Sequence, residues 1–335
     1  MNKRISLAHG DGGELAHKLI QDVFVKHFGH QKEAQLDAAS LTLTNNEIAF
    51  TTDSFVVRPI FFPGGNIGKL AVAGTVNDLA VTGATPKFLT ASFIIEEGFL
   101  IKELETIVES MFKEAGKAGV RIVAGDTKVV ERGSADGLYI NTTGIGVFES
   151  ENQRVMPETI KEGDSIIISG TIGDHGIAIL SARGELGIQS NLLSDCATLN
   201  LMIKDVLNVT NHVKMMRDPT RGGLATTLVE ICEDFQITME IEESLIPVKN
   251  QVHGASDILG FDPLYLANEG KIIFIVAKED EEKVLQALRN HNEGKDACVI
   301  GSVKSKEKGQ LFLTTPIGSK RRLNRLVGMQ LPRIC

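Results

Sequence analysis

The sequence predicts a mixed protein of the α/β (α+β) class, built as two domains of similar design. Short apolar runs typical of strands alternate, in both halves, with longer segments whose apolar residues recur at helical spacing. A polar stretch around Pro157, ESENQRVMPETIKEGDS, separates the two series. At 335 residues the chain is long enough for two hydrophobic cores. We expect domains at residues 1–155 and 156–305 and a flexible tail at 306–335.

The first half contains four strand-like runs and two helical patterns. Strands are expected at 48–57, 88–95, 120–126 and 138–148, and helices at 68–84 and 101–119. The second half repeats the design, with strands at 164–170, 271–277 and 297–303 and helices opening near Ile172 and Asp218. In RDPTRGG, Asp218 is suited to cap a helix and Pro219 to occupy its first position.

Composition excludes several classes of protein. A formal net charge of −8 argues against general affinity for nucleic acid or anionic membranes. The sequence has no signal-peptide pattern and no apolar stretch long enough to span a bilayer. The four cysteines form neither a CxxC pair nor a metal-type cluster. We therefore expect free thiols and a cytoplasmic protein.

Two glycine-rich turns lead into apolar helices. They are HGDGG and PGGNIGK, and the second contains Gly64, Gly65 and Lys69. Converging backbone N–H groups and the positive end of a helix dipole suit such turns to phosphate. Neither is a Walker P-loop or a dinucleotide fingerprint. Taken alone, each is more often a plain loop.

Three aspartates strengthen the interpretation as a nucleotide site. Asp53 and Asp126 follow strand-like runs, and Asp78 lies inside an apolar helical pattern, where an unpaired carboxylate is costly. Carboxylates gathered at strand ends can hold Mg²⁺ and, through it, nucleotide phosphates. Lys128 is placed to balance phosphoryl charge, although most lysines are simply solvated. For any single aspartate the alternative is a helix cap or a surface acid; for the three together we favour the cluster.

Two further polar residues have two interpretations each. Glu269 follows DPLYLAN, which begins at Asp262, and comes directly before a strand-like run. It is either a turn residue or a base pointing into a cleft, and we favour the base. His175 in GDHG is flanked by glycine at a helix start. For this histidine we favour a capping or core role.

The ordered motifs closely resemble one family. HGDGG, TTDSFVVRPIFFPGGNIGK, GTVNDLAVTGA, GDTKVV, SGTIGDHG, RDPTRGG, ANEGK and the final PRIC are similar to the HypE family of nickel–iron hydrogenase maturation factors. The resemblance runs from about His9 to Cys335, essentially the whole chain. That family shares the PurM-like fold of aminoimidazole ribonucleotide synthetase and selenophosphate synthetase.

The resemblance implies a reaction and its partners. The first domain would bind ATP and pair with its copy in a homodimer, and the tail would carry Cys335 into the cleft. A HypF-like carbamoyltransferase would load that cysteine with a carbamoyl group. ATP would then drive dehydration of the S-carboxamide to an S-cyanate. The cyano group would pass to iron on a HypC/HypD-like scaffold.

The residue roles follow from the same resemblance. Mg–ATP would be held by Asp53, Asp78 and Asp126, and Lys128 would contact the phosphoryl or substrate oxygen. Glu269 would be the base and Cys335 the covalent carrier. Asp11 receives no role, because the family turn HGxGG does not require an acid there.

Two rival hypotheses remain at this level. One is another synthetase of the same fold. The N-terminal loop, however, lacks the cysteine of a selenophosphate synthetase, and no DGVGTK-like segment of a ribonucleotide synthetase is present. The other is a nucleotide-binding scaffold that only presents its tail. Turnover of ATP without Cys335 separates the scaffold from the self-modifying enzyme.

Overall fold

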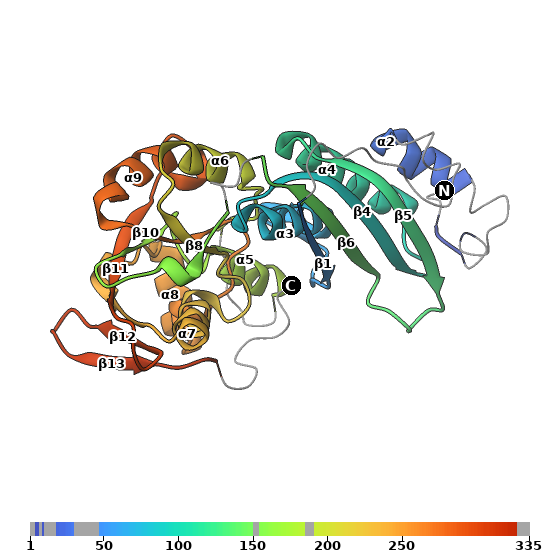
Figure 1. Ribbon diagram of the computed structural model, residues 1–335. Helices are drawn as coiled ribbons and strands as arrows, with labels where there is room; N and C mark the ends of the chain where they lie inside the picture. The colour runs from blue at the N-terminus through green and yellow to red at the C-terminus, as the bar shows by residue number, and fades with distance from the viewer. Residues whose placement is uncertain are drawn as a thin grey trace.

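The computed structural model describes residues 4–6, 9, 18–29, 47–149, 154–184 and 191–326. Its strands form two main sheets, one of four strands from the first half and one of seven from the second. Figure 1 shows the two sheets side by side, with helix α3 (Ile67–Val81) between the first sheet and the second half.

The first sheet has the strand order β1-β6-β4-β5. Its strands are β1 (Ile48–Phe55), β4 (Thr85–Glu96), β5 (Arg121–Val130) and β6 (Leu138–Val147). Helices α3 and α4 (Ile101–Ala118) pack on one face, and a short hairpin of β2 (Phe61–Phe62) and β3 (Gly65–Asn66) precedes α3. Near the N-terminus, η2 (Ile20–Val25) and α2 (Lys26–Phe28) lie against α4. The strands and helices predicted for the first half are confirmed.

The two faces of this sheet differ in burial, as alternation along each strand requires. Leu138, Ile140 and Thr142 of β6 are buried under the helices. On the other face, Phe50 of β1 is 65% exposed and Ile94 of β4 is 43% exposed. Among the described residues, this second face therefore has apolar side chains open to solvent.

The second sheet has the order β13-β12-β9-β11-β7-β10-β8. Its strands are β7 (Ser165–Ile168), β8 (Val213–Arg217), β9 (Thr238–Glu242), β10 (Ile273–Val276), β11 (Cys298–Ser305), β12 (Gln310–Thr314) and β13 (Lys320–Leu323). The helices are α5 (Asp174–Arg183), α6 (Asn200–Val209), α7 (Gly223–Phe235), α8 (Asn250–Leu259) and α9 (Glu281–Arg289). Helix α7 covers one face, and α6 and α9 cover the other.

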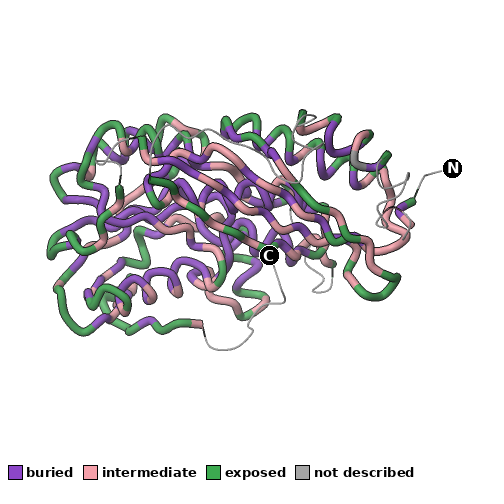
Figure 2. Tube along the Cα trace, turned by 45° about the vertical axis from the view of Figure 1, so that its right-hand side comes forward, coloured by how far each residue is buried: buried purple, intermediate pink, exposed green. Residues whose placement is uncertain are grey.

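This double cover explains the two central strands. Every residue of β7 and of β10 is buried. Figure 2 shows buried stretches, in purple, through the interior of the molecule. Strands buried on both faces read as unbroken apolar runs rather than as alternating patterns. The predicted strands at 164–170 and 271–277 are confirmed for this reason, and the strand predicted at 297–303 is confirmed as the partly buried β11.

The predicted tail at 306–335 starts too early. Strands β12 and β13 lie inside that range and extend the second sheet, with Leu311, Leu313 and Leu323 buried. The neighbouring basic residues hid the short alternation in QLFLT. The domain boundary at 155/156 stays a prediction, and the last strand of the first sheet and the first strand of the second lie on either side of it.

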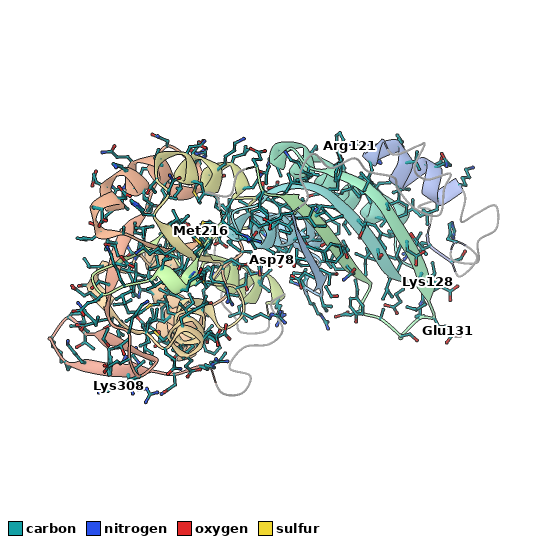
Figure 3. All side chains as sticks on the ribbon, in the orientation of Figure 1. Asp78, Arg121, Lys128, Glu131, Met216 and Lys308 are labelled. Carbon is teal, nitrogen blue, oxygen red and sulfur yellow. The ribbon has the colours of Figure 1, made fainter. Side chains whose placement is uncertain are left out.

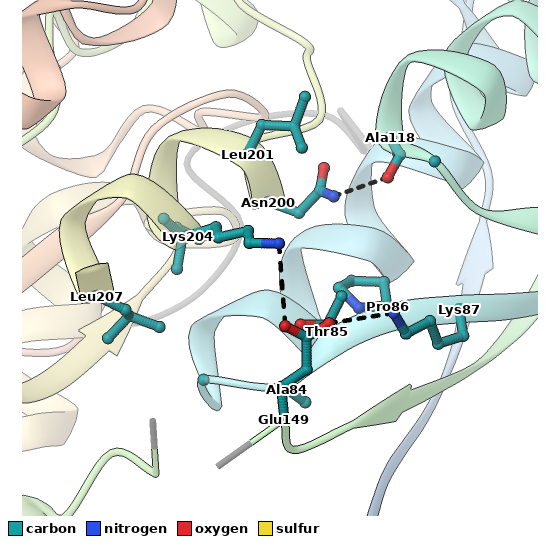
Figure 4. Close-up of a pocket in the computed structure, with 13 residues that line it drawn as sticks. Ala84, Thr85, Pro86, Lys87, Ala118, Glu149, Asn200, Leu201, Lys204 and Leu207 are labelled. Atoms are coloured by element: carbon teal, nitrogen blue, oxygen red, sulfur yellow. Dashed lines mark hydrogen bonds and ion pairs between the residues drawn. The ribbon is translucent and has the colours of Figure 1, made fainter. Parts of the chain in front are cut away.

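Helix α6 joins the second half to the first. Its Asn200 donates to the carbonyl oxygen of Ala118 at the end of α4 (2.8 Å), and Lys204 lies 3.9 Å from Glu149 (Figure 4). The small cavity between them measures about 200 Å³. No helix among the described segments combines the length and apolar character needed to cross a membrane.

A glycine at the start of α7 gives a stability prediction. A Cβ on Gly223 would lie 2.6 Å from the carbonyl oxygen of Leu266, at a φ of +63°. Gly223→Ala should lower the free energy of unfolding by at least about 2 kcal/mol, because it adds left-handed strain to a backbone clash. Urea denaturation measures the change.

The matched control is Gly254→Ala in α8, where a Cβ would have no neighbour within 4 Å. That change should raise stability by about 0.5–1 kcal/mol, the usual helix preference for alanine. Equal effects of the two substitutions would contradict the packing described at Gly223.

Candidate active site

A polar cleft of about 530 Å³ lies between the two halves. Strand β1, helix α3, the segment after β8, helix α7 and the loop before β10 all contribute to its walls. Its lining residues include Thr52, Asp53, Asp78, Arg217, Asp218, Arg221, Glu230 and Glu269. The cleft therefore gathers acids and arginines from both halves of the sequence.

Asp53 and Asp78 meet because β1 packs closely on α3. Gly74 of α3 makes this possible: a Cβ there would lie 2.9 Å from the ring of Phe55 and 3.9 Å from Oδ2 of Asp53. The hydroxyl of Thr51 donates to Oδ2 of Asp78 at 3.2 Å. Two of the three predicted aspartates are thus brought together.

Asp218 is a third acid of this cleft, and the sequence interpretation of it was wrong. Helix α7 begins only at Gly223, after Gly222 in a left-handed conformation, so Asp218 does not cap it and Pro219 is not its first residue. Asp218 is instead half-buried and lines the cleft. The sequence did contain a pattern that could have predicted this position, an acid between the end of a strand and the pair Gly222 and Gly223.

The surroundings of the cleft raise the pKa values of Asp78 and Asp218. Burial, followed by the charges of Asp218 and Asp53, raises the pKa of Asp78 to about 7. Burial and the charge of Asp53 also raise the pKa of Asp218. Repulsion between carboxylates in a poorly solvated cleft favours the binding of a cation there.

The donor set suits magnesium with a phosphate ligand. Among the described residues, no three His, Cys, Asp or Glu side chains lie close enough to hold a metal by themselves. Mg²⁺ binds through one or two carboxylates and completes its shell with water and phosphate oxygens. Arg217, which pairs with Glu230 at 3.3 Å, and Arg221 add positive charge to the same cleft. The residues present therefore fit Mg²⁺ carried by a nucleotide.

Glu269 lies in the cleft with the three aspartates. Only 5% of the residue is exposed. The neighbouring Asn268 holds the region together: Nδ2 donates to the carbonyl oxygens of Pro219 and Leu266, each at 3.0 Å, and Oδ1 accepts from the N–H of Gly173 at 2.7 Å. Asn268 therefore ties the segment of Asp218 to the loop of Glu269.

Asp126 and Lys128 do not reach this cleft. The cross-strand row that contains Asp53 continues through Thr142, Ala91 and Gly125. Asp126 belongs to the neighbouring row, with Ser54, Asn141 and Ser92. Cross-strand partners share a face. Asp126 thus lies on the opposite face from Asp53 and at the opposite edge, three strand spacings or about 14 Å away. Figure 3 shows Lys128 far from Asp78. Within one chain, the predicted cluster with Asp126 and Lys128 is therefore wrong.

Polar groups of the turn that contains Gly64, Gly65 and Lys69 are hydrogen-bonded to other groups of the protein. Oδ1 of Asn66 accepts from the N–H groups of Gly68 (2.9 Å) and Lys69 (3.1 Å). The ammonium of Lys69 donates to the carbonyl oxygen of Gly64 at 3.0 Å. A Cβ on Gly64 would lie 2.8 Å from the backbone of Ser194. These residues do not line the acidic cleft, so the geometry of the cleft does not support the prediction that they bind phosphate.

The other predicted residues divide simply. His175 is fully buried and hydrogen-bonded to the hydroxyl of Ser194 at 2.8 Å, which agrees with a core role. Asp262 caps the N–H of Leu264 at 3.0 Å and lies outside the cleft lining. Asp11 and Cys335 lie outside the described residues.

Comparison with known proteins decides the family. The N-terminal and C-terminal domains of AIR synthase related proteins match residues 35–148 and 161–314. Carbamoyl dehydratase HypE of Rhodobacter capsulatus is 46% identical over 337 residues, covering 100% of this chain and 99% of the relative. The chain belongs to the HypE family. HypE of Escherichia coli is 43% identical over 337 residues, covering 99% of each protein.

Solved structures agree with this assignment. The structure of hydrogenase maturation protein HypE in complex with ATP matches with a TM-score of 0.93 at 46% identity, covering 98% of this chain and 99% of that one. HypE in the HypE–HypF complex matches with a TM-score of 0.80 at 46% identity, covering 94% and 100%. Thiamine-monophosphate kinase of Stenotrophomonas maltophilia, 18% identical with a TM-score of 0.65, shares the fold. The predicted family and PurM-like fold are confirmed.

The electrostatic coupling in the cleft is directly testable. Asp218→Asn removes a negative charge that raises the pKa of Asp78. The pKa of Asp78 should then fall below about 7, because its ionised form loses a repelling neighbour. Carbon NMR titration of the aspartate carboxyls in metal-free buffer measures the shift. Asp205→Asn, an exposed acid on α6 paired with His291, is the control and should leave the pKa of Asp78 unchanged; equal shifts would refute the proximity of Asp78 and Asp218.

Proposed function

We propose that this protein is an ATP-dependent carbamoyl dehydratase whose substrate is the S-carboxamide on its own Cys335. The observation that carries the proposal is the shared cleft of Asp53, Asp78, Asp218 and Glu269, in a chain of the HypE family. HypE relatives are named carbamoyl dehydratases, and a HypE structure contains ATP. The cleft offers the two kinds of group that such a reaction needs, anionic ligands for Mg–ATP and a base.

The chemistry explains why ATP is required. Forming R–S–C≡N from R–S–C(=O)–NH₂ removes one oxygen and two hydrogens, and oxide or hydroxide leaves poorly. Transfer of the γ-phosphoryl group to the amide oxygen makes phosphate the leaving group and releases ADP. Loss of both nitrogen protons and cleavage of the C–O bond then give the S-cyanate. The products are R–S–C≡N, ADP, hydrogen phosphate and one proton.

The cleft residues divide these tasks. Carboxylates of Asp53, Asp78 and Asp218, one or two of them on each ion, would hold Mg²⁺, which when bound neutralises phosphate charge. Arg217 and Arg221 would face the phosphates from the second half. Glu269, buried in the same cleft, would accept a proton from the amide nitrogen. Enclosure strengthens each of these interactions, because the surroundings screen charge poorly.

A homodimer would account for Asp126 and Lys128. The sheet face that carries them also exposes Ile48, Phe50 and Ile94, a group suited to packing on a second copy. A second subunit on this face would place its own Asp126 and Lys128 against the neighbouring chain. The proposal is that these two residues serve the cleft of the partner subunit.

Two further partners belong to the proposal. A HypE–HypF complex is known for relatives, so a HypF-like carbamoyltransferase would load Cys335. A HypC/HypD-like scaffold carrying iron would receive the cyano group. The carrier thiol must stay reduced to be loaded, which suits a reducing cytoplasm.

The central test replaces the proposed base. Glu269→Gln should leave ATP binding intact and lower conversion of the loaded tail at least about 100-fold, because the nitrogen protons lose their acceptor. Intact-mass spectrometry after incubation with ATP, carbamoyl phosphate and the loading partner should show the carboxamide retained on Cys335. Normal loss of one water would remove Glu269 as the base.

Cys335→Ser is the control for the same experiment, and it should gain no stable product mass and stop tail-dependent ATP turnover. Undiminished ATP hydrolysis in this variant would favour the rival scaffold or synthetase function instead.

The dimer is tested by mixing two inactive variants. If each site uses residues of both subunits, Glu269→Gln mixed with Lys128→Ala should recover about one quarter of wild-type activity, since half of the dimers are mixed and each has one intact site. Each variant alone should stay inactive. Absence of recovery, with subunit exchange verified by mass, would place both residues outside a shared site.

A further inference from the structure

A buried strap joins the two walls of the cleft. Residues 194–200 run between the first half and the loop of Glu269 without regular secondary structure until α6 begins at Asn200. The strap is almost entirely enclosed, with Ser194, Cys196, Leu199 and Asn200 all buried. Enclosed backbone of this kind requires specific hydrogen-bond partners.

Its partners in the first half are side chains of α3 and α4. Asn77 of α3 donates to the carbonyl oxygen of Ala197 (3.0 Å) and accepts from the N–H of Leu199 (2.8 Å). Oε1 of the buried Glu114 in α4 accepts from the N–H and the hydroxyl of Thr198, at 3.1 and 3.2 Å. Asn77 directly precedes Asp78, so one end of the strap is fixed beside a cleft carboxylate.

Its partner in the second half is the backbone of Glu269 itself. The two carboxylate oxygens of Asp195 accept from the N–H groups of Glu269 and Gly270, each at 3.2 Å. The N–H of Ala197 donates to the carbonyl oxygen of Glu269 at 3.3 Å. A Cβ on Gly270 would lie only 1.8 Å from the carbonyl oxygen of Asp195, so the two segments are in close backbone contact.

The charge of Asp195 has a matched partner. Its side chain is 2% exposed, and the equally enclosed ammonium of Lys271 lies 3.5 Å from its Oδ2. A buried carboxylate is tolerated only where it is paired and hydrogen-bonded. Within the described part of the chain, Asp195 satisfies this condition through residues 269–271, so its position and that of the Glu269 loop depend on each other.

We infer that Asp195 is a positioning residue that sets the place of Glu269 relative to Asp78 and the nucleotide. Glu269 lies in no helix or strand, so regular secondary structure does not hold its backbone. The strap supplies that restraint, and Ala197 is hydrogen-bonded to both walls. This inference rests on the proposed function, in which Glu269 is the base. A misplacement of about 1 Å at such a group can cost about 100-fold in rate.

The test is a double-mutant cycle on the full chain with its loading partner. Asp195→Asn keeps the size but loses the charge and one acceptor. It should lower single-turnover conversion of the carboxamide about 10- to 100-fold while ATP affinity, measured by calorimetry, changes less than about threefold. Combined with Glu269→Gln, it should add less than about threefold, because both changes disable the same group. The inference would be overturned if the rate losses of the two single variants multiplied in the double variant. A loss of ATP affinity in Asp195→Asn that matches its loss of rate would also overturn it.

Two controls separate the possible failures. Asp205→Asn, an exposed acid on α6 paired with His291, should keep the wild-type rate. If Glu269→Gln converts normally, the proposed base is wrong. If Glu269→Gln is impaired and Asp195→Asn is not, only the positioning role fails.

Hydrogen exchange gives a readout independent of turnover. At least one of the amides of Glu269 and Gly270 should exchange about tenfold faster in Asp195→Asn than in Asp205→Asn, because asparagine offers a single acceptor oxygen for the two N–H groups. Unchanged protection at these amides would also overturn the inference. If Asp195→Asn does not fold, Thr198→Val, which loses only the hydroxyl contact with Glu114, enters the same cycle with an expected loss of about two- to fivefold.

Discussion

Repulsion among three carboxylates in one enclosed cleft is the constraint on which the rest of the structure depends. Burial, together with the charges of neighbouring aspartates, raises the pKa values of Asp78 and Asp218. Like charges held together in a poorly solvated cleft destabilise the folded protein. Binding of a cation with its phosphates offsets this cost in free energy. The cleft is thus organised for a ligand rather than for the empty protein.

The surrounding architecture keeps these charges in place. Helix α3 carries Asp78 against β1 because Gly74 leaves room for Phe55 and Asp53. The second half brings Asp218 and Glu269 through loops fixed by Asn268. The strap of residues 194–200 then connects the helices of the first half to the Glu269 loop. Cleft geometry is set by a few buried polar side chains whose hydrogen bonds tie separate segments of the chain together.

The sheet of the first half separates two kinds of surface. Its helix-covered face carries Asp53, and its open face carries Asp126 with exposed apolar residues. Alternation along the strands and the strand order place Asp126 on the opposite face and at the opposite edge from Asp53, so one chain does not bring both to the same cleft. The proposed pairing with a second copy would use the open face, and it suits the symmetry of most oligomers.

The sequence by itself determined the family, the two-half α/β design and most strands and helices of the first half. Long, regular apolar patterns such as those of α4 and β10 depend on local spacing, which a sequence displays directly. It also singled out Asp53, Asp78 and Glu269. Short, charged strands such as β13 were missed, because their burial comes from neighbours distant in the chain.

Only the tertiary structure decided which acids meet. Asp126 and Asp53 each follow a strand-like run in the sequence, yet strand order and register place Asp126 on the other face of the sheet. Asp218 resembled a helix cap, but two left-handed glycines delay the helix and leave the carboxylate at the cleft. Asp195 carried no signal at all, since its partners are backbone groups more than seventy residues away. Convergence of side chains is a property of packing, and packing is specified by contacts that spacing along the sequence does not record.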